Sequence, residues 1–203
     1  MKLKVIDLFS GLGGWTQSFM KSHKYQVERY DSDPWLRDVE NTEIVDLTQE
    51  KIEYPDCIPA PHLLVGSPPC YEFSLAHSAP RSIAMRNGEK FTPSMDCVLA
   101  FREHVENLNP KFWLMENVKG SAEFINPIMG EPRQIIGPFI LWGNFPLLDI
   151  SESELKVIKE HKKKAGNKHR WSDHRGSYRA FIPEPMSNAL FRSVSSPTLE
   201  DWL

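Results

Sequence analysis

The chain has 203 residues, a length that fits a single domain with a core of its own. Apolar residues make up 40% and charged residues 25%, which argues against disorder, and no apolar run approaches the roughly 18 residues that a membrane helix needs. Three cysteines without a CxxC pair disfavour a disulfide framework and a zinc cluster, so we expect no metal site and a reducing, cytoplasmic environment. The net charge of −3 does not indicate nucleic-acid binding, so any such function must rest on local charge.

Short apolar strands alternate with helical segments along the chain. The start predicts a strand over 2–9, a glycine turn over 10–14 and a helix from 15 to 21. Further strands are predicted over 25–30, 42–45, 62–65, 111–115 and 139–142, and a further helix over 95–108. Because strands that alternate with helices form parallel sheets, the pattern predicts an α/β fold with a mostly parallel sheet and helices on both faces.

Four of these strands are each followed directly by a residue with useful chemistry. These residues are Asp31, Asp46, Cys70 and Glu116. In such sheets, ligands bind at the carboxyl ends of the strands. We therefore expect the four residues to line one site.

The segment Asp7 to Gly14, DLFSGLGG, is a glycine-rich turn between a strand and a helix. Glycines let the backbone approach a ligand closely, and a helix N-terminus favours carboxylate or phosphate groups. Thr16 occupies the position of the third glycine of the dinucleotide fingerprint, which weakens an NAD interpretation. A plain structural turn remains the alternative.

Asp31 and Asp46 suit two contacts to a nucleoside. A carboxylate after the second strand can accept hydrogen bonds from both ribose hydroxyls, and one after the third strand can accept from an adenine amino group. The alternative for each residue is helix capping or turn formation, which is common for aspartate.

The segment Gly66 to Ser74, GSPPCYEFS, places two prolines before a cysteine. The prolines stiffen the chain and would hold the Cys70 thiol where the sheet ends, in a position for nucleophilic catalysis. Cys57 and Cys97 lack this context and are interpreted as structural. Glu116 leaves an apolar strand, so we expect its pKa to be raised, which suits proton donation; a helix cap or surface ion pair is the alternative.

A basic segment lies late in the chain. Residues 156–179 contain nine Lys or Arg against Glu160 and Asp173, a local net charge of +7, with Trp171 and Tyr178 among them. This composition favours phosphate contact with base stacking, and a solvated helix face is the alternative. The histidines at 161, 169 and 174 lack metal-ligand spacing and are assigned to the same segment.

Taken in order, DLFSGLGG, Asp31, Asp46, GSPPC and MENV resemble the cytosine-C5 DNA methyltransferase family, in a minimal, phage-like form. GPFILWGNFP and FIPEPMSNALFRSV are similar to later motifs of that family, so the likeness spans nearly the whole chain. The resemblance implies a Rossmann-like class I fold, S-adenosyl-L-methionine (AdoMet) as methyl donor with S-adenosyl-L-homocysteine as product, and DNA as substrate. It also implies a restriction-modification setting in the cytoplasm of a bacterium or phage-infected host.

The resemblance assigns roles residue by residue. Cys70 would be the nucleophile that adds to C6 of cytosine, and Glu116 would act on the ring nitrogen. The residues implied to hold AdoMet are Phe9, Ser10, Gly11, Gly13, Gly14, Asp31, Trp35, Asp46 and Pro68. The residues implied to contact the substrate are Ser67, Pro69, Asn117, Arg133, Lys162, Lys163, Arg175 and Arg179.

Two features depart from the family pattern. The Arg-rich motif offers one arginine, Arg133, for which Arg175 or Arg179 would substitute. The short basic segment 151–180 stands where the family carries a sizeable target-recognition domain, within one catalytic domain over 1–203. We therefore expect recognition of a loose or very short site, or a protein partner that supplies it. Methylation of RNA or free nucleotides, and a catalytically silent AdoMet- or DNA-binding subunit, remain as alternatives.

Overall fold

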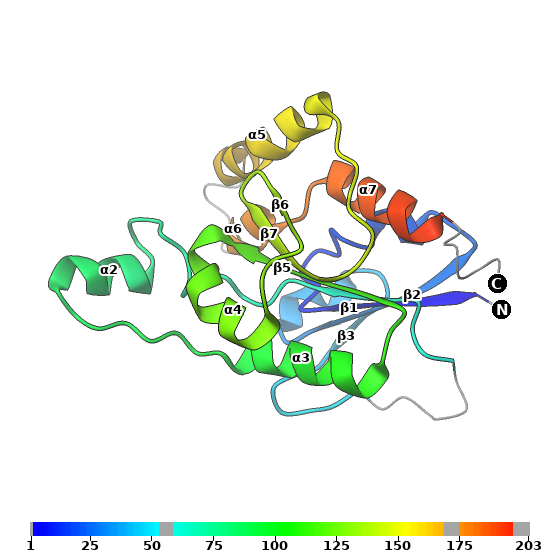
Figure 1. The fold of residues 1–203 in the computed structure, drawn as a ribbon, viewed down its shortest axis with the longest axis horizontal. Helices are drawn as coiled ribbons and strands as arrows, with labels where there is room; N and C mark the ends of the chain where they lie inside the picture. Colours follow the sequence, from blue (N-terminus) through cyan, green and yellow to red (C-terminus); the bar gives the residue numbers. More distant parts are fainter. Residues whose placement is uncertain (1, 53–58, 169–174, 197–203) are drawn as a thin grey trace.

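The computed structural model describes residues 2–52, 59–168 and 175–196, without the side chains of 162–168, 175–176 and 179. Within this part the chain forms a seven-stranded sheet in the order β3-β2-β1-β4-β5-β7-β6 (Figure 1). The strands are β1 (Leu3–Leu8), β2 (Tyr25–Asp31), β3 (Thr42–Ile44), β4 (Leu63–Gly66), β5 (Phe112–Val118), β6 (Gln134–Ile136) and β7 (Phe139–Asn144). The first five pair in parallel, whereas β7 is antiparallel to both β5 and β6. This confirms the predicted α/β fold with a mostly parallel sheet.

Helices cover both faces of the sheet (Figure 1). They are α1 (Gln17–Met20), α2 (Pro80–Asn87), α3 (Asp96–Leu108), α4 (Ala122–Met129), α5 (Glu152–Lys168), α6 (Arg175–Ala180) and α7 (Glu184–Ser195), with 3₁₀ turns η1 (Pro34–Asp38) and η2 (Lys119–Ser121). Consecutive strand residues point to opposite faces, so Val5 packs in the core under α1, α5 and α7, and Ile6 in the core under α3 and α4. Burial on both faces explains why β4 and the first half of β5 are continuously apolar.

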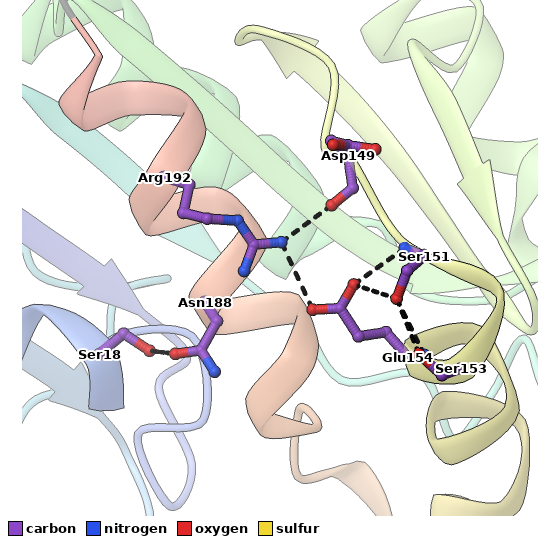
Figure 2. Close-up of polar contacts among 7 residues, drawn as sticks. All are labelled: Ser18, Asp149, Ser151, Ser153, Glu154, Asn188 and Arg192. Carbon is purple, nitrogen blue, oxygen red and sulfur yellow. Dashed lines mark hydrogen bonds and ion pairs between the residues drawn. The ribbon is translucent and has the colours of Figure 1, made fainter.

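Helix α7 packs beside the short α1 on the same face of the sheet. The Ser187 hydroxyl donates to the Trp15 carbonyl (2.7 Å), and the Ser18 hydroxyl donates to Asn188 (2.7 Å; Figure 2). At the other end of α7, Arg192 donates to the Asp149 carbonyl (3.0 Å) and to Glu154 (3.4 Å). The C-terminal motif is therefore fixed both to the glycine turn and to the start of α5.

The start of α5 is capped by its own side chains. The Ser151 backbone N–H donates to Glu154 Oε2 (2.8 Å), and the Glu154 N–H donates to the Ser151 hydroxyl (3.3 Å; Figure 2). This reciprocal pair is a capping box, which stabilises a helix N-terminus. The basic segment, for which a solvated helix face was one interpretation, therefore begins as a well-defined helix.

Several local predictions differ from the structure. Glu116 lies inside β5 rather than after it, and Asp31 is the last residue of β2. The predicted helix over 15–21 reduces to α1, because turns occupy 11–16. Strand β6 was not predicted, since three residues carry too little periodicity; it forms because Gly137, at φ 57°, turns the chain back into β7.

In the described part of the chain, no helix combines the length and apolar character needed to cross a membrane. The same residues contain no group of three or more His, Cys, Asp or Glu side chains arranged to hold a metal ion.

Candidate active site

The carboxyl ends of four strands lie in one row. Leu8 of β1 pairs with Tyr30 of β2 on one side and with Gly66 of β4 on the other, and Gly66 pairs with Met115 of β5. The glycine turn, Asp31, the Pro-Pro-Cys turn and Glu116 follow these four positions within a few residues. The sheet therefore brings all four predicted segments to the same edge.

The glycine turn has an unusual backbone. Phe9, Gly11 and Gly13 all have positive φ, of 52°, 52° and 71°. For Phe9, which has a Cβ atom, this left-handed conformation costs roughly 1–2 kcal/mol. Such strain is typical of functional sites, where surrounding contacts hold the backbone in place. Here the Ser10 N–H donates to the Tyr30 carbonyl (3.1 Å), which ties the turn to β2.

Asp31 lies directly against this turn. Its carboxylate accepts from the Gly11 N–H (2.8 Å) and from the Asp33 N–H (3.0 Å). Asp33 in turn accepts from the Trp35 N–H (3.0 Å) and caps η1. The structure thus brings Asp31, the turn and Trp35 together, as predicted. The ring centroids of Trp35 and Tyr178 lie 5.9 Å apart, so α6 of the basic segment reaches this end of the sheet.

Asp46 is exposed, and its carboxylate closes a turn. It accepts from the Thr48 backbone N–H (3.0 Å) and the Thr48 hydroxyl (2.7 Å), and these hydrogen bonds lower the pKa of Asp46. This is the turn-forming role that was the alternative for Asp46, and a contact with adenine remains a prediction.

Cys97 lies near these carboxylates, a position that nothing in the sequence indicates. It is half-buried near the start of α3. Burial raises the pKa of its thiol, and the negative charges of Asp46 and Asp31 raise it further. Cys97 is therefore an uncharged thiol beside the expected cofactor residues. Cys57 lies outside the described residues.

The Pro-Pro-Cys turn is held from two sides. The Trp15 indole N–H donates to the Ser67 hydroxyl (3.1 Å), and the Asn117 amide donates to the Pro68 carbonyl (3.0 Å). Pro68 is buried, Pro69 exposed and Cys70 half-buried. The Cys70 backbone is therefore fixed relative to both the glycine turn and β5.

Glu116 and Asn117 occupy adjacent positions in β5. Glu116 is 6% exposed and pairs in register with Leu141 of β7. Asn117 is fully buried, and its side-chain oxygen accepts from the Val118 N–H (2.9 Å). Both ends of the Asn117 amide thus bond protein groups. Asn117 was predicted to contact substrate, and here it positions the Cys70 turn.

Of the other predicted substrate residues, Ser67 and Pro69 lie in the turn that carries Cys70, whereas the Arg133 side chain bonds elsewhere. The Arg133 guanidinium donates to the Phe145 carbonyl (3.2 Å). Phe145 follows the last residue of β7, which pairs with Trp113 near the amino end of β5. The remaining four lie in the basic helices, and their side chains are outside the described residues: Lys162 and Lys163 in α5, and Arg175 and Arg179 in α6.

After Cys70 the chain forms an arm that carries α2 and projects from the body (Figure 1). Four of its large apolar side chains are exposed: Tyr71 (63%), Leu75 (60%), Ile83 (42%) and Met85 (63%). Arg81 holds the base of the arm, since it donates to the Gly120 carbonyl and pairs with Glu123 just beyond β5. Helix α2 has no counterpart among the predicted helices. Pro80 at its start and left-handed Gly88 (φ 70°) at its end were the available signals.

Comparison with known proteins agrees with this geometry. Residues 3–126 match the family model for C-5 cytosine-specific DNA methylases. The chain belongs to the C-5 cytosine-specific DNA methylase family. The matched range contains the glycine turn, Asp31, Cys70 and Glu116. It ends before β6, so the basic segment lies beyond it.

Two curated type II methyltransferases are similar to the chain. M.DdeI of Desulfomicrobium norvegicum is 25% identical over 154 residues, which are 66% of this chain and 34% of that protein. M1.HphI of Haemophilus parahaemolyticus is 30% identical over 128 residues, which are 58% of this chain and 33% of that protein. The chain thus spans about a third of the length of each relative.

Solved structures resemble the chain at lower identity. A protein described as a DNA modification methyltransferase encoded within an E. coli prophage is 21% identical, with a TM-score of 0.48, over 75% of this chain and 50% of that one. A SAM-dependent methyltransferase from Aquifex aeolicus is 13% identical, with a TM-score of 0.40, over 70% and 82% of the two chains.

The glycine turn fits the methyl donor that this family implies. The Ser10 hydroxyl is buried and has no hydrogen-bond partner among the described residues. Buried polar groups are normally bonded, so an orphan beside a strained turn indicates that a ligand supplies the partner. A carboxylate at the end of β2 is also in the place where such folds bind ribose.

Proposed function

We propose that the protein transfers a methyl group from AdoMet to C5 of cytosine in DNA, through a covalent bond between Cys70 and C6. The observation that carries this proposal is a continuous series of contacts across the site. Trp15 of the glycine turn bonds Ser67, and Asn117, next to Glu116, bonds the Pro68 carbonyl. The glycine turn, the turn that carries Cys70 and strand β5 with Glu116 are therefore coupled by direct hydrogen bonds.

AdoMet would be held by the glycine turn, Asp31 and Trp35. Ser10 and the turn backbone would meet its methionine portion, Asp31 its ribose, and Trp35 and Asp46 its adenosine end. Bound AdoMet supplies an electrophilic methyl group on a sulfonium. Trp35 is 36% exposed, so an aromatic surface is available to a planar base.

Cys70 and Glu116 would perform the steps on cytosine. C5 of cytosine is a poor nucleophile, and addition of the Cys70 thiolate to C6 makes C5 electron-rich enough to accept a methyl group. Glu116 would stabilise the ring at N3 while charge develops there. Loss of the C5 proton to a base then expels Cys70 and restores the aromatic ring. A buried Glu116 favours this role, since burial strengthens a hydrogen bond to the ring.

DNA is the substrate class that the family indicates, and two features of this chain support it. The basic helices α5 and α6 provide a local excess of positive charge, and α6 reaches Trp35 through Tyr178. The arm after Cys70 exposes four large apolar side chains. A target base in a duplex must leave the stack, and exposed apolar side chains can occupy the space that it leaves. With only a short basic segment, we infer that target recognition is loose or depends on a protein partner.

The test is methyl transfer to matched substrates. The protein is incubated with methyl-labelled AdoMet and cytosine-containing duplex DNA, RNA of the same sequence, or free cytidine nucleotides, and 5-methylcytosine is quantified by mass spectrometry. The proposal expects label in DNA alone. Label in RNA or nucleotide would change the substrate class, and AdoMet binding without transfer to any of them would indicate a binding subunit. Cys70→Ser is the matched control for the thiol.

A further inference from the structure

We propose that Arg29 is a positioning residue for the methyl donor: it holds the glycine turn and the segment after η1 in the arrangement that binds AdoMet. This inference rests on the proposed function, because it names what shapes the donor pocket. Arg29 lies on β2, two residues before Asp31, and its side chain points beneath the turn rather than into solvent.

The Arg29 guanidinium joins the glycine turn to the segment that leads from η1 into β3. Its Nη2 donates to the Gly13 carbonyl in the glycine turn (3.3 Å), and its Nη1 donates to the Glu40 carbonyl after η1 (2.8 Å). Its Nε donates to the Thr16 hydroxyl (2.8 Å). The whole residue is 5% exposed. A planar guanidinium can serve three acceptors at once, whereas a lysine ammonium lacks this fixed fork.

Two unusual residues of the turn are explained by this guanidinium. A Cβ atom at Gly13 would lie 2.4 Å from Arg29 Cζ, and Gly13 has a φ of 71°, so a side chain there would strain the backbone and displace the guanidinium. Thr16, which departs from the glycine of dinucleotide-binding turns, is fully buried and uses its hydroxyl twice: it accepts from Arg29 and donates to Asp7 Oδ2 (2.9 Å). The turn is thus built around Arg29.

Asp7 places a buried carboxyl group at the bottom of this network. It is 1% exposed at the end of β1, and it is linked to Arg29 through the single Thr16 hydroxyl. A buried guanidinium without a nearby carboxylate would be costly, so the pair and its bridge are expected to act as a unit. The Asp7–Thr16–Arg29 network therefore determines where the turn backbone stands relative to Asp31.

The experiment uses the full chain and compares Thr16→Val, Thr16→Ser and Arg29→Lys. Valine keeps the volume of threonine but removes the hydroxyl that links Arg29 to Asp7, whereas serine keeps that hydroxyl. Lysine keeps the positive charge of Arg29 but lacks the planar guanidinium. The dissociation constant for AdoMet is measured by calorimetry, and KM and kcat are measured for AdoMet and DNA separately. Melting temperature reports folding. Arg102→Lys is the matched control, because Arg102 is exposed on α3 and pairs with Glu106.

We expect Thr16→Val and Arg29→Lys to weaken AdoMet binding by about tenfold, the size that loss of one or two buried hydrogen bonds produces. Thr16→Ser should restore wild-type affinity, and the KM for DNA should stay unchanged. If the variants melt at lower temperature yet bind AdoMet within about twofold of wild type, Arg29 is only structural and the proposal is overturned. If Arg29→Lys does not fold, the valine and serine pair decides alone. Failure of the wild type to bind AdoMet would instead overturn the proposed function.

Discussion

The two sides of the candidate site are built differently. The proposed donor side, formed by β1 to β3 and the glycine turn, contains a buried network of hydrogen-bonded polar groups in Asp7, Thr16 and Arg29. The substrate side, formed by Cys70 and the arm with α2, exposes large apolar groups such as Tyr71 and Met85. A small donor of constant shape can bind in a preorganised pocket. DNA is a polymer, so the interface on the substrate side is complete only when the DNA is bound.

Replacement of Cys70 should have the largest effect on methyl transfer and should leave AdoMet binding unchanged. Cys70→Ala removes the nucleophile, so methyl transfer should fall on the order of 10⁴-fold or more. The donor side should be unaffected, with the AdoMet dissociation constant within about threefold of wild type. Radiolabel transfer and calorimetry on the same preparations measure both. Appreciable transfer by the alanine variant would remove the covalent mechanism.

Glu116→Gln should have the next largest effect. The amide keeps the shape but cannot donate a carboxyl proton to the ring nitrogen, so kcat should fall on the order of 10²- to 10³-fold. AdoMet binding should be unchanged, because the residue belongs to the substrate side. Single-turnover kinetics give the rate of the chemical step. Glu106→Gln, exposed on α3 and paired with Arg102, is the control and should retain the wild-type rate.

Asp31→Ala tests the donor side. It removes the carboxylate that holds the Gly11 N–H and, by our proposal, the ribose, so AdoMet affinity should drop by about tenfold or more. Calorimetry gives the dissociation constant, with Asp38→Ala as an exposed control on η1. An affinity equal to wild type would show that Asp31 only forms the turn. DNA binding should be the same in both variants.

The basic segment should affect binding of DNA alone. Charge reversal at Lys162, Lys163 and Lys164 is expected to weaken DNA binding and to flatten the dependence of log K on log salt concentration. Fluorescence anisotropy at several salt concentrations measures this slope. Reversal at Lys24 and Lys111, which precede β2 and β5 at the opposite edge of the sheet, serves as the control. An unaltered slope in the triple variant would show that the run is a solvated helix face.

Asp7 predicts a smaller, pH-dependent effect on the donor side. Burial raises the pKa of Asp7 from 3.8 to about 7, although Arg29 and Thr16 lower it and Asp31 raises it slightly further. In the unfolded chain the group titrates near 4, so between roughly pH 4 and 7 the folded state binds the additional proton. Binding of this proton increases the free energy of unfolding. The increase is complete below pH 4 and is lost as the pH rises through 7.

Asp7→Asn removes that titration. Relative to wild type, the variant should become progressively more stable as the pH rises from 4 to 7, with no further change above. Urea denaturation at several pH values measures the difference, and Asp38→Asn on exposed η1 is the control. A stability difference independent of pH would contradict a raised pKa for Asp7.

The sequence predicted the parts of the molecule that depend on local patterns. Apolar runs located six of the strands to within a few residues, and the motifs placed Asp31, Cys70 and Glu116 at one edge of the sheet. These predictions succeed because strand periodicity and parallel topology follow from neighbours in the chain.

The parts that the sequence did not predict depend on contacts between distant residues. Arg29 showed no motif, because its partners Gly13, Thr16 and Glu40 come from other elements. Nothing local shows that the Asn117 amide donates to the carbonyl of Pro68, 49 residues earlier, and the predicted contact of Asn117 with substrate stays a prediction. For the same reason a pattern alone could not distinguish a side chain that contacts a ligand from one that positions its neighbour.

One measurement tests the central proposal most directly. The protein is incubated with AdoMet and DNA in which cytosine is replaced by 5-fluorocytosine, whose fluorine blocks the final elimination. The proposal predicts a denaturant-stable adduct of protein and DNA, mapped by mass spectrometry to Cys70 and absent without AdoMet or in Cys70→Ala. Methylation of ordinary DNA by the same preparation without such an adduct, or an adduct at another cysteine, would contradict it.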